Sequence, residues 1–446
     1  MTAPDHLRIT GPEDILGFIP HSLGYWPQNS LVAMTLQGKR LGATLRIDLP
    51  GPGGGSGRTV GGTAGFAGFA RTVASYLEAD DAADGSLLAF FTGGDGDSDG
   101  GDIDGTGDGA LWARLLTELE LALEEAGMPL RDAWIIGAEY WRNAYCSDPA
   151  CCAPPGRPVD EIRNSRLNAE MVFRGSRVGA APGAPAAELP LRRPDPATLE
   201  AELGWSQEFS GRRRDRAQFG QVLDVWMRVL RAASSPGAPP GLPPDRTPDL
   251  SPGLAGYLRA SLCVQAWRDA VLVMAAAGRA AAERGAEEFA VFDTRTLTRP
   301  PGTQPPAAPP PAPMPMLEGF PAEEPPGPAP GPVGGPHEAP GYGDVLLGLA
   351  PSVPDWALMV KLERVLVQLG GDGGAEARAA SLTARGWIEW CRGRGSFADA
   401  LFRQAVHEYP GYRLAELLAE LARRGTLCGW AARREAAWQK FAPDAA

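Results

Sequence analysis

Five side chains in the first third of the chain have types that could do chemistry together: His21, Arg46, Asp48, Arg142 and Cys146. Arginine binds acidic groups bidentately, and a neighbouring carboxylate can orient it. Histidine titrates near neutral pH and can act as an acid, a base or a metal ligand, and a thiolate binds soft metals. We treat these five residues as the candidate ligand-binding residues.

Arg46 and Asp48 lie two residues apart on a predicted strand, so their side chains face the same way. Leu45, Ile47 and Leu49 take the opposite face. Two interpretations stay open. The pair forms the floor of a polar pocket, or it is a solvent-facing ion pair on a half-exposed sheet, which contributes little to stability.

His21 follows Pro20, which we expect to end a short helix, and it begins a turn-rich loop that runs to Ser30. A histidine in such a loop is either a turn residue or a functional group. The sequence has no G-x-S-x-G motif and no Ser, His and Asp set at a known family spacing. Catalytic residues therefore stay unknown at this stage.

The cysteines Cys146, Cys151 and Cys152 form a cluster in a Pro-rich stretch. Zinc sites usually take four ligands from paired CxxC-like motifs, and this spacing differs from them. The cluster is a site for zinc or another soft metal, a redox thiol site, or a tight turn whose small thiols help to pack a sheet edge. No cofactor follows from the spacing alone.

The composition of the 446 residues restricts the classes of function. Hydrophobic residues make up 44% and charged residues 22%, which is ordinary for globular proteins. The net charge of −12 disfavours nucleic acid as a partner, because phosphate binding needs a basic field. No apolar run approaches the length needed to cross a bilayer, and we expect no secretory leader, because the first residues do not show a basic and then apolar pattern. We expect a cytoplasmic protein with reduced thiols, no membrane association, and an unknown protein or small molecule as its partner.

The order of the predicted elements indicates an α/β fold in the first part of the chain. We expect a mixed sheet with packed helices, because the first two strands form a hairpin and the later crossovers favour parallel pairing. The expected helices span residues 7–20, 66–79 and 111–126, and the expected strands span residues 31–36, 41–49, 86–92 and 133–140.

After residue 195 the strand signal nearly vanishes, and the rest of the chain is expected to be all-helical. The predicted parts are an α/β domain at 1–178, a helical region at 190–298, a Pro-rich linker at 299–343 and a C-terminal helical region at 344–446. The linker is expected to be extended and polyproline-like. The last region also carries the spacing of one tetratricopeptide-like helical hairpin, from Gly386 to Pro410.

Three segments carry a resemblance to a known family. They are Pro20 to Val32 with Arg46 to Pro50, Arg142 to Cys146 with Cys151 to Pro158, and Tyr409 to Ala415. Together they resemble the family called domain of unknown function 4192, which is found in actinobacteria. The resemblance covers most of the chain outside the Gly- and Asp-rich loops and the linker. It implies an uncharacterised protein and carries over no activity.

Two classes of function remain open. The first and preferred one is a ligand- or partner-binding protein with a helical scaffold region. The alternative is an enzyme with a polar and thiol pocket formed by Arg46, Asp48, Arg142 and Cys146. We also predict that the loop 21–30 and the segment 142–158 lie beside each other over the carboxyl ends of neighbouring strands, where open α/β sheets bind ligands.

Overall fold

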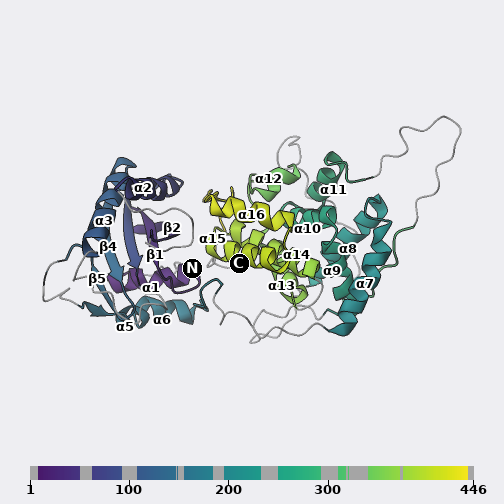
Figure 1. The fold of residues 1–446 in the computed structure, drawn as a ribbon, viewed down its shortest axis with the longest axis horizontal. Coiled ribbons are helices and arrows are strands. Elements are labelled where there is room, and N and C mark those ends of the chain that lie inside the picture. Colours follow the sequence, from purple (N-terminus) through teal and green to yellow (C-terminus); the bar gives the residue numbers. More distant parts are fainter. Residues whose placement is uncertain are drawn as a thin grey trace, which may run out of the picture. The chain divides into compact units, whose positions relative to one another are not determined.

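The chain folds into two compact units, Met1–Ala187 and Glu188–Ala446, here called unit 1 and unit 2 (Figure 1). The structure is a computed structural model. It describes residues 9–50, 63–92, 108–146, 148, 155–183, 195–232, 250–292, 310–317, 320, 340–371 and 375–439.

Unit 1 is built on a six-stranded sheet with the strand order β2-β1-β3-β4-β5-β6. Only β3 and β4 pair in parallel, and the other neighbours are antiparallel, so the predicted mixed sheet with packed helices is confirmed. The elements are α1 (Pro12–Leu23), β1 (Ser30–Gln37), β2 (Arg40–Asp48), α2 (Thr63–Leu77), β3 (Gly85–Phe91), α3 (Asp108–Glu125), β4 (Leu130–Ile136), β5 (Tyr140–Asn143), β6 (Arg157–Pro158), α5 (Asp160–Arg163) and α6 (Arg166–Phe173).

Helices α2 and α3 cover one face of this sheet (Figure 1). The apolar stripe of α2 includes Phe66, Val73 and Leu77, which recur at helical spacing and are buried. They pack with Leu31 and Phe90, which project from the same face of the sheet. We call this side the α3 face.

Helices α1 and α5 cover the opposite face, here called the α1 face. Leu16 and Ile19 of α1 pack there on Val32, Phe91 and Trp134, which alternate along their strands with the residues of the α3 face. Both faces of the sheet are therefore buried, and each has its own apolar core.

The sequence predicts that helix α1 ends at Pro20, but the helix continues to Leu23. It ends at Gly24, whose left-handed φ of 91° suits a residue without a Cβ atom. A proline inside a helix removes one backbone hydrogen bond. The α1 helix is held by its packing on the sheet, and His21 therefore lies in its last turn and not in a loop.

Asp14 joins the beginning of α1 to the beginning of α6. Its buried carboxylate accepts hydrogen bonds from the backbone N–H (2.9 Å) and hydroxyl (2.6 Å) of Thr10 and from the N–H of Leu167 (3.2 Å). Burial alone would raise the pKa of Asp14, but these hydrogen bonds outweigh it and hold the pKa below its ordinary value. The carboxylate thus caps α6 from another helix.

The secondary structure of unit 2 is helical throughout its described residues, as predicted, and these residues form no strand. Helices on both sides of the predicted linker share one apolar core, which includes Trp226, Tyr257, Trp267, Trp387 and Trp430. The elements are α7 (Pro196–Ser210), α8 (Arg216–Ala232), α9 (Pro252–Leu262), α10 (Gln265–Ala277), α11 (Arg279–Glu288), α12 (Tyr342–Leu346), α13 (Trp356–Leu369), α14 (Ala375–Cys391), α15 (Gly395–Glu408) and α16 (Arg413–Arg423).

No single helix in the described ranges is both long enough and apolar enough to cross a bilayer. Helices α9 and α10 together satisfy the length and composition, but they meet at an angle of 102°. Their side chains lie in the core of unit 2.

A buried arginine connects three helices of unit 2. Arg259 of α9 is 3% exposed and contacts Glu202 of α7 at 2.6 Å. It also donates to the backbone oxygens of Leu369 and Gly371 at the end of α13. The carboxylate and the carbonyl oxygens together satisfy a charge that would be costly to bury alone.

Helices α14 and α15 form an antiparallel hairpin in which Gly386 faces Phe402 of the second helix. A Cβ atom built at Gly386 would lie 2.5 Å from the Phe402 ring, so this position has no room for a larger residue. Gly386 and Phe402 both lie inside the segment predicted to be a tetratricopeptide-like hairpin. The likeness to a tetratricopeptide repeat stays a prediction.

The structure predicts a pH-dependent contribution from Asp14. Asp14→Asn should lower the free energy of unfolding of unit 1 by about 1–3 kcal/mol at pH 7, because the donors of Thr10 and Leu167 lose a charged acceptor. Since the folded pKa is depressed, the wild-type advantage is present above the ordinary pKa of 3.8 and is lost as the pH falls below it. Urea denaturation of both proteins from pH 7 to pH 3 tests this, with the exposed Asp81→Asn as control. A difference that does not depend on pH would contradict it.

Gly386→Ala should destabilise unit 2 by about 1–3 kcal/mol, because the new methyl group overlaps the Phe402 ring in a packed core. Gly395→Ala is the matched control, since a Cβ atom at Gly395 meets nothing within 4 Å. Thermal melts followed by circular dichroism measure both. Equal melting temperatures for the two variants would show that the Gly386 contact is not tight.

Candidate functional site

Arg46 and Asp48 form a contact on the edge strand β2. Arg46 Nη2 lies 2.6 Å from Asp48 Oδ1, and Arg46 Nε donates to Ser30 Oγ at 2.8 Å. The same-face prediction for this pair is confirmed. Because Arg46 pairs with Val32 in register, the group lies on the α1 face, with Arg46 half-buried and Asp48 exposed. The arrangement fixes the beginning of β1 against the end of β2.

His21 is fully buried between α1 and α6. Its Nε2 atom lies 2.7 Å from Asn168 Oδ1 and its Nδ1 atom lies 2.9 Å from Ser176 Oγ. Asn168 Nδ2 donates to Arg163 O at 2.6 Å, which turns Oδ1 toward the histidine and places a proton on Nε2. His21 therefore links two helices in the interior and is not presented to a ligand.

The segment after His21 forms a packed corner on the α1 face. Trp26 meets Phe91 edge to face, with ring centroids 5.8 Å apart, and the Arg163 guanidinium lies 5.1 Å from the Trp26 ring centroid. Tyr25 is buried and forms an isolated parallel β-bridge with Gly179. These contacts hold the chain between α1 and β1.

Arg142 lies on the other side of the sheet. It stands opposite Ile135 in the β4–β5 register, and Ile135 in turn stands opposite Phe90 of β3. Since directly opposed residues share a face, Arg142 belongs to the α3 face, and the sheet separates it from Arg46 and Asp48. The five residues singled out from the sequence do not form one pocket.

Cys146 follows β5, where the side chain of Asn143 accepts hydrogen bonds from the N–H groups of Tyr145 (2.9 Å) and Cys146 (3.1 Å). Cys151 and Cys152 lie outside the described residues. Within the described ranges, no group of three or more His, Cys, Asp or Glu side chains is arranged to hold a metal ion. Zinc binding by the cysteine cluster stays a prediction.

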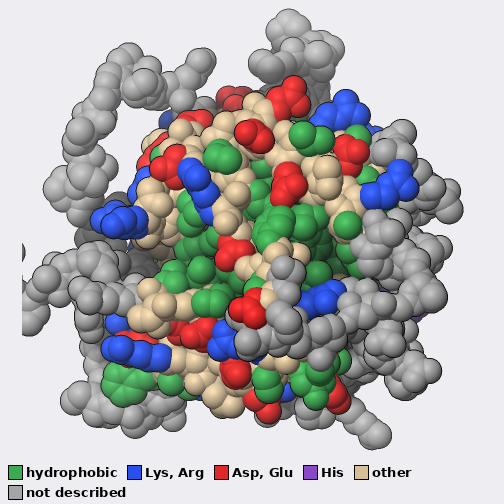
Figure 2. Space-filling model, turned by 90° about the vertical axis from the view of Figure 1, so that its left-hand side faces the viewer, with side chains coloured by type: hydrophobic (Ala, Val, Ile, Leu, Met, Phe, Trp, Pro, Cys, Tyr) green, Lys and Arg blue, Asp and Glu red, His purple; other side chains and the backbone are tan. Residues whose placement is uncertain are grey.

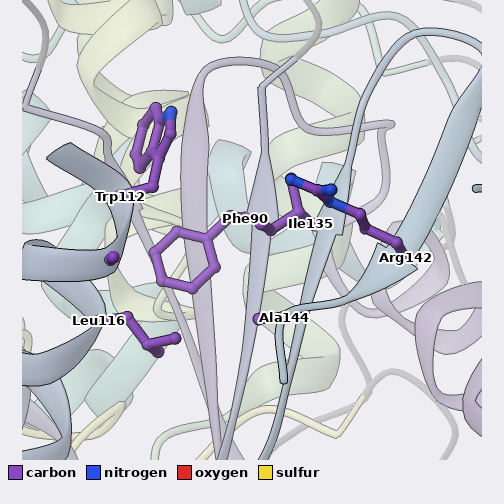
Figure 3. Close-up of a pocket in the computed structure, with 7 residues that line it drawn as sticks. Phe90, Trp112, Leu116, Ile135, Arg142 and Ala144 are labelled. Atoms are coloured by element: carbon purple, nitrogen blue, oxygen red, sulfur yellow. The ribbon is translucent and has the colours of Figure 1, made fainter. Parts of the chain in front are cut away.

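The structure adds a pocket between α3 and the sheet that the sequence does not reveal (Figure 3). Its volume is about 150 Å³. The described residues that line this α3 pocket come from β3, α3, β4, β5 and the residue after β5: Phe90, Trp112, Ala113, Leu116, Ile135, Arg142 and Ala144. Arg142 alone among them carries a charge.

The walls of the α3 pocket are aromatic and aliphatic. Phe90 and Trp112 meet edge to face with ring centroids 6.1 Å apart and an interplanar angle of 65°. Arg142 extends from β5 toward Ile135 and toward the side on which Phe90 and Trp112 lie (Figure 3). An apolar pocket with one well-placed polar group is the usual form of a small-molecule site.

The segment Arg142 to Cys146 builds one side of this pocket. Arg142 and Ala144 line it, and Asn143 fixes the turn that follows. Tyr145 donates to the carboxylate of Glu120 on α3, and burial together with this carboxylate raises the pKa of the tyrosine. The turn is thereby attached to the helix that forms the opposite wall.

Figure 2 shows hydrophobic side chains gathered in the middle of one face of unit 1, with acidic and basic side chains around them. Part of the apolar surface of unit 1 is therefore open to solvent on this face. Apolar patches framed by charged residues are common at binding sites.

Six of the seven pocket residues were missed from the sequence: the two alanines Ala113 and Ala144, and the larger Phe90, Trp112, Leu116 and Ile135. Each of the four larger residues belongs to an apolar strand or helix stripe, and such residues carry no sign of whether they face a core or a cavity. The available signal is the cation of Arg142, two residues after the end of the strand predicted at 133–140.

The fold and the pocket define an α/β domain with an apolar, cation-lined site, followed by a helical unit. The chain belongs to the family described as Domain of unknown function (DUF4192), which it matches over residues 12–309. Two of the three segments that carry the resemblance lie within these residues, and the third, at 409–415, lies outside them. Neither the curated proteins nor the solved structures yield a match.

His21→Leu should lower the free energy of unfolding of unit 1 by about 1–3 kcal/mol, because Asn168 and Ser176 would lose a buried partner. His21→Gln keeps a donor and an acceptor and should lose less. Hydrogen exchange of the α1 and α6 amides measures both changes in the full chain. If leucine and glutamine cost the same, the histidine contributes through its shape and not through its hydrogen bonds.

Proposed function

We propose that unit 1 is a binding domain whose α3 pocket takes a small organic acid with one aromatic or branched apolar group. The apolar group lies against Phe90, Trp112 and Leu116, and the acidic group contacts Arg142. The observation that carries this proposal is the position of Arg142 at an otherwise apolar pocket.

The size of the pocket supports a small apolar group. Apolar cavities of about 150 Å³ admit one benzene-sized group, whereas whole drug-sized ligands need several hundred cubic ångströms. The edge-to-face pair of Phe90 and Trp112 offers a flat aromatic ring the packing geometry that such rings prefer. A ligand of this class therefore inserts one ring or one branched chain.

The charge of Arg142 supports an acidic group on the same ligand. A guanidinium binds a carboxylate through two parallel hydrogen bonds, and such contacts strengthen where water is partly excluded. Arg142 is half-buried, and its strand neighbour Ile135 is apolar. A carboxylate at the pocket mouth would meet this cation while its apolar part stays inside.

The helical unit serves in this proposal as the scaffold region of a cytoplasmic binding protein. Its described residues pack around one continuous core, which suits a rigid body. We propose a binding role in preference to an enzymatic one, because Arg142 lies on the opposite face of the sheet from Arg46 and Asp48.

Arg142→Met provides the test. Binding of benzoate and of its neutral isostere benzamide to the full chain is measured by ligand-observed NMR and calorimetry. Loss of one charge-assisted contact of about 1.5–3 kcal/mol should weaken benzoate binding about 10- to 100-fold and leave benzamide nearly unchanged. The melting temperature should stay close to that of the wild type, because Arg142 is not in the core.

Arg131→Met, an exposed arginine on the neighbouring strand, is the matched control and should change neither affinity. Equal binding of benzoate and benzamide by the wild type would refute the role of Arg142. Wild-type binding of benzoate that survives Leu116→Phe, which fills the pocket, would place the ligand elsewhere.

A further inference from the structure

A short Pro-rich segment, residues 310–317, lies on unit 2 in a defined position, although it belongs to the predicted linker. We call it the strap. It is neither helix nor strand, and its Ala312 is 3% exposed. Pro315 is also buried, whereas Met314 and Met316 are exposed. Burial at every third residue matches the three residues per turn of a polyproline helix.

Two glutamines of α8 hold the backbone of the strap. Gln218 Oε1 accepts a hydrogen bond from the N–H of Ala312 at 2.7 Å, and Gln221 Nε2 donates to the oxygen of Ala312 at 2.8 Å. The glutamines are three residues apart, so they share one side of the helix. Arg212 Nε donates to the oxygen of Pro310 at 2.9 Å. The surface therefore binds the backbone of an extended chain.

The N–H of Ala312 makes this contact selective. Proline has no N–H group, so Pro310, Pro311, Pro313 and Pro315 cannot donate to Gln218. The surface thus requires a residue other than proline in the middle of a proline-rich stretch. The burial of Ala312 further requires that this residue be small.

The side chain of Gln218 contacts the extended chain of the strap and is not exposed to solvent. Its side chain is 0% exposed, and its Oε1 atom accepts the hydrogen bond from the Ala312 N–H. If the strap left, Oε1 would lose this partner, which is unfavourable for a buried amide. An extended backbone that offers an N–H at this position satisfies the Gln218 carbonyl.

We propose that the surface formed by Arg212, Gln218 and Gln221 is a recognition site for proline-rich peptides. It takes a partner segment with the pattern Pro-Pro-x-Pro, where x is small and keeps its N–H. The strap is the chain's own ligand for this site. Because it is tethered, it acts at a high effective concentration and competes with the partner segment. The site is separate from the α3 pocket and does not depend on the function proposed for it.

The test uses a fluorescent peptide with the sequence of residues 308–320 and the full chain, with binding followed by fluorescence polarisation. Ala312→Pro in the chain removes the N–H that holds the strap. Release from the tethered competitor should tighten peptide binding at least about tenfold relative to the wild type. Ala312→Gly keeps the N–H and should behave as the wild type. Adding Gln218→Leu to the Ala312→Pro chain should abolish binding.

A substituted peptide distinguishes recognition of the N–H group from recognition of the polyproline shape alone. A peptide with proline in place of its alanine is a better polyproline helix, yet it should fail to bind because it cannot donate to Gln218. If this peptide binds as well as the parent, the surface does not recognise the N–H, and the proposal is overturned. Failure of the parent peptide to bind an Ala312→Pro chain that melts like the wild type also overturns it.

Two further measurements cover the remaining outcomes. If Ala312→Pro does not fold, the wild-type chain is used instead. Excess peptide should then abolish the protection of the Ala312 amide from hydrogen exchange. Unchanged protection would overturn the proposal. Light scattering then reports the oligomeric state. A wild-type dimer that the peptide dissociates would assign the site to the strap of a second copy and overturn the partner assignment.

Discussion

The two-residue period of the sheet in unit 1 decides which side chains can act together. Both faces of the sheet are covered by helices, so each residue of the central strands is assigned to one of two separate cores. A slip of one residue in the β4–β5 register would move Arg142 from the α3 face to the α1 face. The α3 pocket depends on the β4–β5 register, and the face occupied by Arg46 and Asp48 depends in the same way on the β1–β2 register.

Much of the fold could be predicted from local patterns. The β1–β2 hairpin and the common face of Arg46 and Asp48 follow from alternation over neighbouring residues. The mixed sheet follows from the order of helices and strands. The end of α1 could not be predicted in the same way, because packing on the sheet carries the helix past Pro20, a residue that by itself favours termination.

The candidate site required information that is not local. The face occupied by Arg142 depends on how β5, a strand of four residues, pairs with β4. The pocket also needs α3 to lie across Phe90 and Ile135, which depends on tertiary packing. His21 shows the reverse case, since a residue type that is common in active sites is here buried and hydrogen-bonded to Asn168 and Ser176.

In unit 2, the hydrogen bond from Arg259 to the backbone oxygen of Leu369 joins positions that are 110 residues apart in the chain. The free energy needed to close such a loop grows only with the logarithm of its length, and each doubling adds about 0.6 kcal/mol. A small change in the length of the chain between these two positions would therefore change the free energy of closing the loop only slightly. Selection on folding would scarcely oppose such a change in length, provided that the Arg259 contacts and the helices that they join stay the same.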